Sequence, residues 1–421
     1  MKSMREALAE HPNTPSAILE WLATDPSDDV RCDVAGNSST PPGVIRLLGR
    51  DPDFMTRSIA RSHPGMLQSD LEAFAMEAEN LRPIASNPSA PQALLARLAS
   101  DADDDIRARV ASNANTSSET LRTLESDPSG NVRAALIENP NTSPGTLLDL
   151  AETLMNFKSG SWASLRHLEN LSMDLGSHPW LALARNPSSP VEILVMFATN
   201  ESPDIRRVAA AAPRTPPEVL AKLLQDGRPA VQAAAAENTA TPGSALADFL
   251  SQLGEPDMRA REQPAWKAAR NPSTPPLALR DLAAQDTSWY SSFIAANPST
   301  PIDVLMDFWR EETGSVRAAL GANPSMPAEI IDALARDSDR IARIHVALNP
   351  AAPISTLRRL AEDPDPEVRE WLARREVIPT YVLDMLASDR ESRVAIAAVG
   401  NISVPVATLT RLALAEGFPG N

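Results

Sequence analysis

Arginine side chains stand at one fixed position in a long series of repeated segments. Each lies six residues before a turn residue that is usually asparagine, and this row consists of Arg5, Arg31, Arg57, Arg107, Arg133, Arg206, Arg317, Arg343 and Arg369. Guanidinium groups at a constant spacing could bind an acidic peptide or a phosphate backbone. A structural role is the other interpretation, because aspartates stand six residues before many of them: Asp25, Asp51, Asp101, Asp127, Asp337 and Asp363. We favour the structural role and expect each aspartate to pair with its arginine or to cap the following helix.

A second group of candidate residues belongs to an insertion at residues 152–179. It brings aromatic and histidine side chains together in a chain of which 4% is aromatic: Phe157, Trp162, His167, His178 and Trp180. Long loops in repeat proteins often carry function, and aromatic residues are frequent at interface hot spots. We predict that these residues contact a partner; the alternative is that the insertion packs on its own solenoid. The two histidines lack an HExxH motif and a nearby cysteine, which argues against a metal or catalytic role.

A third group lies in the middle of the chain, after a smaller insertion at residues 252–265. Trp266, Trp289 and Tyr290 follow one another there, where the arginine row lapses. These side chains could form a second contact patch, and the alternative is that they fill core space at an irregular junction.

All of these residues are positioned by a repeat. Its turn residues, called anchors below, are His11, Asn37, His63, Asn87, Asn113, Asn139, Asn186, Ala212, Asn238, Asn271, Asn297, Asn323, Asn349, Arg375 and Asn401. Eleven of the fourteen spacings between neighbouring anchors are 26 residues. A fixed period of this length is typical of a solenoid, in which each unit buries its apolar face against its neighbours.

Each unit predicts two short helices. A hydroxyl three residues after the anchor, followed by proline, predicts a helix N-cap and first helical position, and Thr215 with Glu218 and Ser189 with Glu192 match the capping box. Leu or Ile at offset eight and Leu or Phe at offset eleven, present in all fifteen units, share one helix face and predict the core. A second helix ends at the next anchor, where asparagine tolerates a left-handed terminus.

The predicted architecture is all-α: a curved α-solenoid of about fifteen two-helix repeats, forming a single body over residues 1–421. Residues 1–10 supply a second helix without its first, and residues 401–421 supply a first helix without its second. We expect Phe418 to fold over the open end. Self-association through the two ends is a further possibility that the sequence leaves open.

Composition narrows the function classes. A net charge of −16 argues against broad affinity for nucleic acid or anionic membranes. The single Cys32 excludes a disulfide framework and a multi-cysteine metal site. Without the apolar core of a signal peptide or an apolar run of 18 residues, the sequence predicts a soluble cytoplasmic protein without a cofactor.

The pattern NPxTPxxxLxxLAxDPxxxVRxxVA, seen in Asn349–Ala373 and extending over essentially the whole chain, resembles the leucine-rich repeat variant family of bacterial solenoids. The resemblance implies α-helices alternating with short 3₁₀-type helices, and a scaffold that, like HEAT and armadillo proteins, presents a long surface to a partner. The cysteine-rich iron–sulfur segment of some members is not carried over to a chain with one cysteine. We predict a non-enzymatic scaffold that binds another protein or a peptide, with nucleic-acid binding through the arginine row as the alternative.

Overall fold

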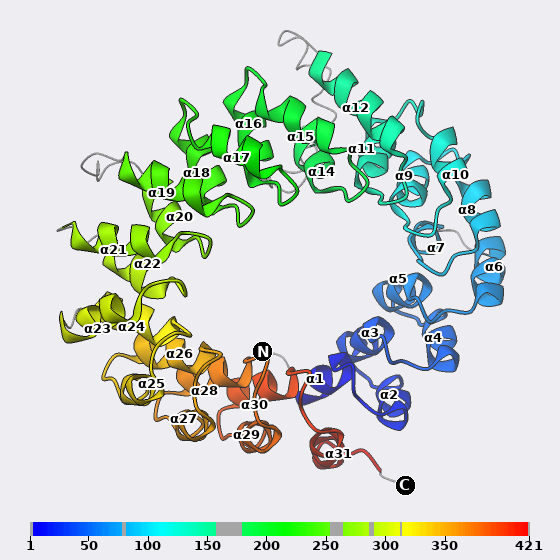
Figure 1. Ribbon diagram of the computed structural model, residues 1–421. Coiled ribbons are helices and arrows are strands. Elements are labelled where there is room, and N and C mark those ends of the chain that lie inside the picture. Colours follow the sequence, from blue (N-terminus) through cyan, green and yellow to red (C-terminus); the bar gives the residue numbers. More distant parts are fainter. Residues whose placement is uncertain are drawn as a thin grey trace. The chain divides into compact units, whose positions relative to one another are not determined.

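The computed structural model describes residues 3–77, 81–156, 179–252, 264–285, 290–311 and 314–419. Within these ranges every regular element is a helix, and each repeat consists of a first helix and a second helix (Figure 1). The predicted all-α solenoid with two helices per repeat is therefore confirmed. Both helices are α-helical, so the short 3₁₀-type helices that the resemblance implied are not the second elements here.

Most first helices begin at or just after a proline four or five residues beyond the anchor; α6 and α10 begin after Leu67 and Ser117 instead. They are α2 (Ser16–Leu22), α4 (Pro42–Leu48), α6 (Gln68–Glu77), α8 (Gln92–Leu98), α10 (Ser118–Thr123), α12 (Pro144–Asn156), α15 (Val191–Ala198), α17 (Pro217–Leu223), α19 (Gly243–Ser251), α21 (Pro276–Ala284), α23 (Ile302–Glu311), α25 (Ala328–Leu334), α27 (Ile354–Leu360), α29 (Thr380–Leu386) and α31 (Val406–Ala415).

The second helices end immediately before an anchor or within two residues of it. They are α1 (Met4–Glu10), α3 (Asp28–Gly36), α5 (Phe54–Ser62), α7 (Arg82–Ala85), α9 (Asp104–Ser112), α11 (Gly130–Glu138), α14 (Pro179–Arg185), α16 (Pro203–Ala211), α18 (Pro229–Glu237), α20 (Pro264–Arg270), α22 (Ser291–Ala296), α24 (Gly314–Ala322), α26 (Arg340–Leu348), α28 (Pro366–Ala373) and α30 (Ser392–Val399).

The helices group into two compact units. One unit contains residues 1–11 and 198–417, and the other contains residues 12–197 and 418–421. Within each unit the first helices follow the convex side of the curve and the second helices follow the concave side (Figure 1). The single body predicted for residues 1–421 stays a prediction.

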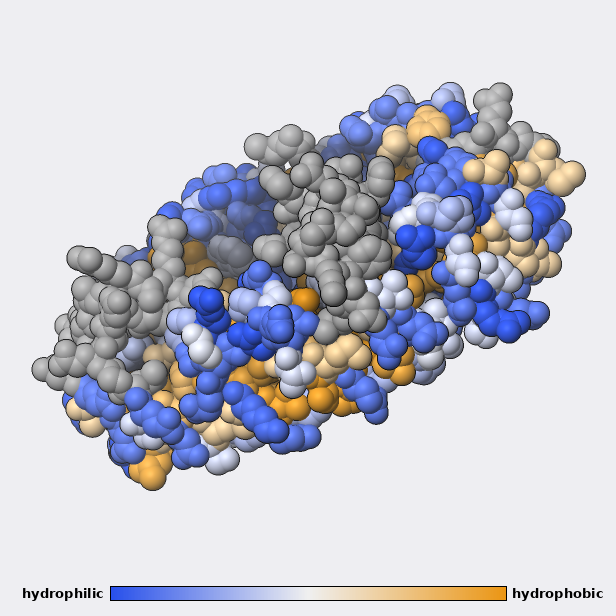
Figure 2. All heavy atoms as spheres, turned by 90° about the horizontal axis from the view of Figure 1, so that it is seen from above, coloured by the Kyte–Doolittle hydropathy of each residue, from blue (hydrophilic) through white to orange (hydrophobic). Residues whose placement is uncertain are grey.

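The core follows the two predicted leucine positions. The residue at offset eight is buried in every repeat, and the residue at offset eleven is buried in all but one, where Leu150 is half-buried. In the irregular third repeat, Leu71 and Phe74 still fill these places at 0% and 2% exposure. Burying each such side chain stabilises the fold by about 1.5–3 kcal/mol. On the face drawn in Figure 2, hydrophilic residues and smaller hydrophobic areas alternate over the described surface.

The anchors join one repeat to the next by hydrogen bonds. Asn323 donates from Nδ2 to the carbonyls of Ala295 and Asn297, at 2.7 and 2.9 Å, and its Oδ1 accepts from Ser325 N at 2.8 Å. Its neighbour Asn349 repeats this arrangement with Gly321 and Asn323. The anchors flanking the second helices have extended backbones, as at Asn349 with φ −66° and ψ 119°. The predicted left-handed terminus is therefore wrong: asparagine is used for its amide, which ties three backbone groups together.

The threonine after each anchor also differs from the prediction. Thr300 Oγ1 donates to the carbonyl of Ile294, six residues earlier, at 2.5 Å, and Thr116 does the same to Val110 at 2.6 Å. In most first helices the residue at the N-cap is the proline, as at Pro216, where no side chain caps the helix; in α10 the N-cap is Ser117, whose hydroxyl accepts from Thr120 N. The capping boxes predicted at Thr215 and Ser189 are therefore absent; Thr215 instead donates to the carbonyl of Ala209. These hydroxyls close the second helix because that is where unpaired carbonyls remain.

The insertions and the chain ends can also be compared with what the sequence predicts for them. The helix predicted to resume at Trp180 is present as α14, and residues 152–156 of the insertion continue α12. The extra helix considered for residues 164–175 lies outside the described residues. Phe418 contacts Trp21 edge-on, with ring centroids 5.8 Å apart.

Candidate functional site

The arginine row forms a ladder of ion pairs between successive repeats. Arg369 donates from Nε and Nη2 to both carboxylate oxygens of Asp389, at 2.8 and 3.0 Å, and from Nη1 to the carbonyl of Asp363 at 2.6 Å. Nε of the row arginine contacts the aspartate twenty residues later in five further pairs: Arg31–Asp51, Arg107–Asp127, Arg206–Asp226, Arg317–Asp337 and Arg343–Asp363.

The prediction that row arginines pair with aspartates is thus right, but the aspartate that provides the carboxylate is not the one predicted. The aspartate six residues before each arginine offers its backbone carbonyl, and its carboxylate serves the arginine of the preceding repeat. This carboxylate also accepts a backbone N–H two residues on, as Asp363 does from Asp365. A neighbouring aspartate caps the second helix instead, as when Asp365 accepts from Glu367 N.

The ladder arginines are largely inaccessible. The arginine side chains of these six pairs are between 6% (Arg369) and 24% (Arg317) exposed. The hydrogen bond from Arg107 lowers the pKa of Asp127, and that from Arg206 lowers the pKa of Asp226, so both carboxylates stay ionised beside their partners. A guanidinium whose fork is already filled by a carboxylate offers no paired donors to a phosphate.

The other predicted site residues fall into three groups. Phe157, Trp162, His167, His178 and Trp289 lie outside the described residues. Trp180 and Tyr290 are 5% and 7% exposed, and burial raises the pKa of Tyr290. Trp180 packs edge-on against Phe197, with ring centroids 5.5 Å apart. The structure therefore leaves Trp266 as the predicted residue, among those described, that combines aromatic character with partial exposure.

Trp266 forms one wall of a groove on the concave side of its unit. Its ring stacks on Phe293 at 5.3 Å, which fixes its orientation. The groove has a volume of about 520 Å³. It is lined by small side chains of α16 and α18 between Arg207 and Trp266: Ala211, Ala230, Ala233 and Ala234. Alanines leave the space that longer side chains would fill.

Charged groups border this groove. Lys267 Nζ lies 2.7 Å from Glu237 Oε1 and 4.2 Å from the centre of the Trp266 ring, a cation–π contact. Arg207 lines the opposite part and is exposed. In this repeat Gln232 replaces the ladder arginine and donates to the carbonyl of Asp226, at 2.8 Å. The arrangement can hold an apolar side chain over the alanines and a carboxylate near the cations.

The sequence analysis did not identify the alanines that line the groove. The sequence does contain a run of small residues at 233–236, in a repeat that has Gln232 where other repeats have the row arginine. The run was not informative by itself, because alanine is also frequent in the other second helices. Only the neighbouring Trp266 makes it a groove.

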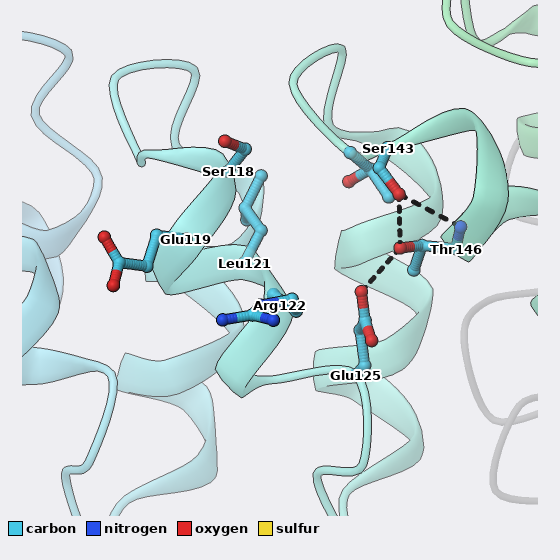
Figure 3. Close-up of a pocket in the computed structure, with 8 residues that line it drawn as sticks. Ser118, Glu119, Leu121, Arg122, Glu125, Ser143 and Thr146 are labelled. Atoms are coloured by element: carbon cyan, nitrogen blue, oxygen red, sulfur yellow. Dashed lines mark hydrogen bonds between the residues drawn. The ribbon is translucent and has the colours of Figure 1, made fainter.

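A second pocket, of about 390 Å³, lies between α10 and α12 (Figure 3). Thr146 Oγ1 donates to Glu125 Oε1 at 2.5 Å, and its hydroxyl lies 2.7 Å from that of Ser143. Arg122 and Glu125 face the space between the two helices (Figure 3). Since the pocket combines both charges with hydroxyls already bonded to one another, it favours no particular ligand.

The described residues also bear on metal sites and on membrane spans. In the described ranges, no group of three or more His, Cys, Asp and Glu side chains is placed to hold a metal ion. None of the helices in those ranges is both long enough and apolar enough to cross a membrane.

The fold and these surfaces define an α-solenoid repeat protein. No protein-family model and no curated protein matches the chain. Among solved structures, it is similar to a leucine-rich repeat variant with a novel repetitive structural motif, at 21% identity over 58% of this chain and 88% of that chain, with a TM-score of 0.34. The repeat pattern resembles the same family.

Two further likenesses cover nearly the whole chain. A chain in a homology model of the full-length AP-3 complex is 12% identical over 98% of this chain and 95% of that chain, with a TM-score of 0.24. A chain from a structure describing the interaction between cadherin and β-catenin is 15% identical over 94% of this chain and 98% of that chain, again with a TM-score of 0.24.

Proposed function

We propose that this protein is a non-enzymatic scaffold that binds another protein or a peptide along the concave side of its second helices. The observation that carries the proposal is the half-buried Trp266, held by Phe293 beside the alanine-lined groove. Aromatic residues that are rigid and partly exposed next to a hollow are typical binding hot spots.

The charges around the groove suggest the chemistry of the partner. Arg207 is exposed and forms no ion pair with any described residue, while Lys267 is held close to the ring of Trp266. We propose that the partner segment places an apolar side chain over Ala233 and Ala234 and a carboxylate near Arg207. A cation beside an apolar hollow suits that combination because the apolar contact excludes water from the ion pair.

The insertion at residues 152–179 belongs to the same proposal as a second, independent contact. Its aromatic residues are proposed to add specificity, and most of them lie outside the described residues. Nucleic-acid binding through the arginine row is the weaker alternative, because each paired ladder arginine already donates to an aspartate.

The test begins with capture of partners from the native lysate on the immobilised full-length chain, followed by their identification. A captured protein is then purified and its affinity measured for the wild type, Trp266→Ala and Arg207→Glu. The matched controls are Trp309→Ala, another half-buried tryptophan but on the first helix α23, and Arg358→Glu, an exposed arginine of the first helix α27.

The proposal expects both groove variants to weaken binding by tenfold or more, corresponding to about 1.4 kcal/mol, and both controls to bind as the wild type does. Equal binding by all four variants would refute the groove as the site. Replacement of residues 157–178 by a Gly-Ser linker tests the insertion separately. Capture of nucleic acid, released as salt is raised, would favour the alternative.

A further inference from the structure

The N-terminal helix α1 is stabilised locally by its own cap. Ser3 Oγ accepts from Glu6 N at 3.2 Å, and Glu6 Oε2 accepts from Ser3 N at 3.1 Å, which completes a capping box. A helix of seven residues is nevertheless too short to be stable alone in water. Its position therefore depends on what it packs against.

Helix α1 packs against α30 and α31, which come from the other end of the sequence and belong to the same unit. Leu8 is fully buried and stands three residues before the anchor His11. The same place is taken by Ala398 before Asn401 and by Leu372 before Arg375, and both are fully buried. Helix α1 thus buries the position three residues before its anchor, which is the position that the second helices α28 and α30 bury.

The anchor hydrogen bond also continues from one end of the sequence to the other. Asn401 Nδ2 donates to the carbonyl of Arg375 at 2.7 Å, and Arg375 Nη1 donates to that of Asn349 at 2.6 Å. In the next step Nε2 of His11 lies 3.0 Å from the carbonyl of Asn401. His11 follows Asn401 in space as each anchor follows the one before it in sequence.

We infer that residues 3–11 are a docking element that completes the repeat begun by α31. The surface formed by α30 and α31 is a binding site whose occupant is the N-terminal helix of the same chain. This surface is separate from the groove at Trp266. The arrangement also bears on self-association through the ends, because the face that a second copy would need is filled by α1.

The experiment uses the full chain with a recognition site for a specific protease inserted after the exposed Asn13. The folded protein is cleaved, and size-exclusion chromatography then shows whether the N-terminal segment still elutes with the remainder. A fluorescent synthetic peptide of residues 1–13 is added to the cleaved protein to measure exchange. The same peptide carrying Leu8→Asp is the specific variant, and one carrying Glu10→Gln, at an exposed position of α1, is the control.

Retention of the cut segment in a monomeric complex, and exchange with the labelled peptide, is the expected result. The Leu8→Asp peptide should bind at least tenfold more weakly than the Glu10→Gln peptide, because it places a charge among buried apolar groups. Release of the segment on cleavage, while hydrogen exchange shows α16 and α18 still protected, would overturn the inference. So would retention only in dimers, which would make a second copy the occupant.

Discussion

The guanidinium of Arg369 and the carboxylate of Asp389 are joined by two parallel hydrogen bonds, Nε to Oδ2 at 2.8 Å and Nη2 to Oδ1 at 3.0 Å. Their side chains are 6% and 10% exposed, so the pair is largely removed from water. Twenty residues separate the two in sequence, which places them in successive repeats. The pair therefore links one repeat to the next, and its loss destabilises the packing between these two repeats.

Replacing Arg369 by alanine leaves the carboxylate of Asp389 without its main partner at a site with little water. We expect the free energy of unfolding to fall by about 3–5 kcal/mol, the usual effect of breaking a buried pair by removing one partner. Urea denaturation followed by circular dichroism measures this. Arg310→Ala is the control, because its pair with Asp307 is 68% and 66% exposed and should contribute less than about 1 kcal/mol. Equal losses in both variants would contradict the structural role of the ladder.

Replacing the anchor Asn323 by alanine removes two donors and one acceptor at a fully buried position. Three backbone groups lose their partner, and we expect a loss of roughly 2–4 kcal/mol in the free energy of unfolding. Asn323→His should lose less, because His63 shows that an imidazole can serve an anchor: its Nε2 lies 3.0 Å from the Asn37 carbonyl and its Nδ1 accepts from Gly65 N. Thermal unfolding ranks the two variants; a histidine variant less stable than the alanine variant would contradict this account.

The two histidine anchors predict a dependence on pH. Burial lowers the pKa of His11 and of His63 from the ordinary value of 6.5. The unfolded chain therefore takes up protons more readily than the folded chain below about pH 6.5. The stabilisation is fully present above that pH and is lost as the pH falls through the lowered pKa values of the folded state.

The double variant His11→Asn, His63→Asn installs the anchor residue that most other repeats use. We expect it to match the wild type in melting temperature near about pH 8 and to exceed it near about pH 5. Differential scanning calorimetry across this range makes the comparison. Parallel curves for the two proteins would show that neither imidazole is linked to stability.

Close packing of second helices predicts a strict size limit at Gly321. A Cβ atom there would lie 3.1 Å from the carbonyl of Ala342 and 3.3 Å from Cγ2 of Val346, both on α26. Gly321→Val should therefore lower the free energy of unfolding by about 1–3 kcal/mol, the usual effect of overpacking. Gly36→Ala is the control, because its new Cβ meets Ile59 at an ordinary 3.7 Å and should not destabilise the protein. Chemical denaturation distinguishes the two outcomes.

The sequence by itself determined the repeat, its two helices and its buried face. Leu19 and Leu22 share one helix face and must be covered, and the period of 26 residues brings a like pair from each neighbour to cover them. It also determined that the arginine row has acidic partners, since the aspartates stand in the same repeat pattern. These features depend on spacing along the chain, which a sequence records directly.

Only the tertiary structure decided in which repeat the partner of a given residue lies. Arg343 could pair with Asp337 or with Asp363, and the spacing alone favours neither; stacking brings the carboxylate of Asp363 to the guanidinium and leaves Asp337 to offer its carbonyl. In the same way, nothing in the sequence joins His11 to Asn401. Every repeat carries the same residue types at the same positions, so the sequence does not show which copy of a residue lies beside which. The packing of one repeat on the next decides which residues pair.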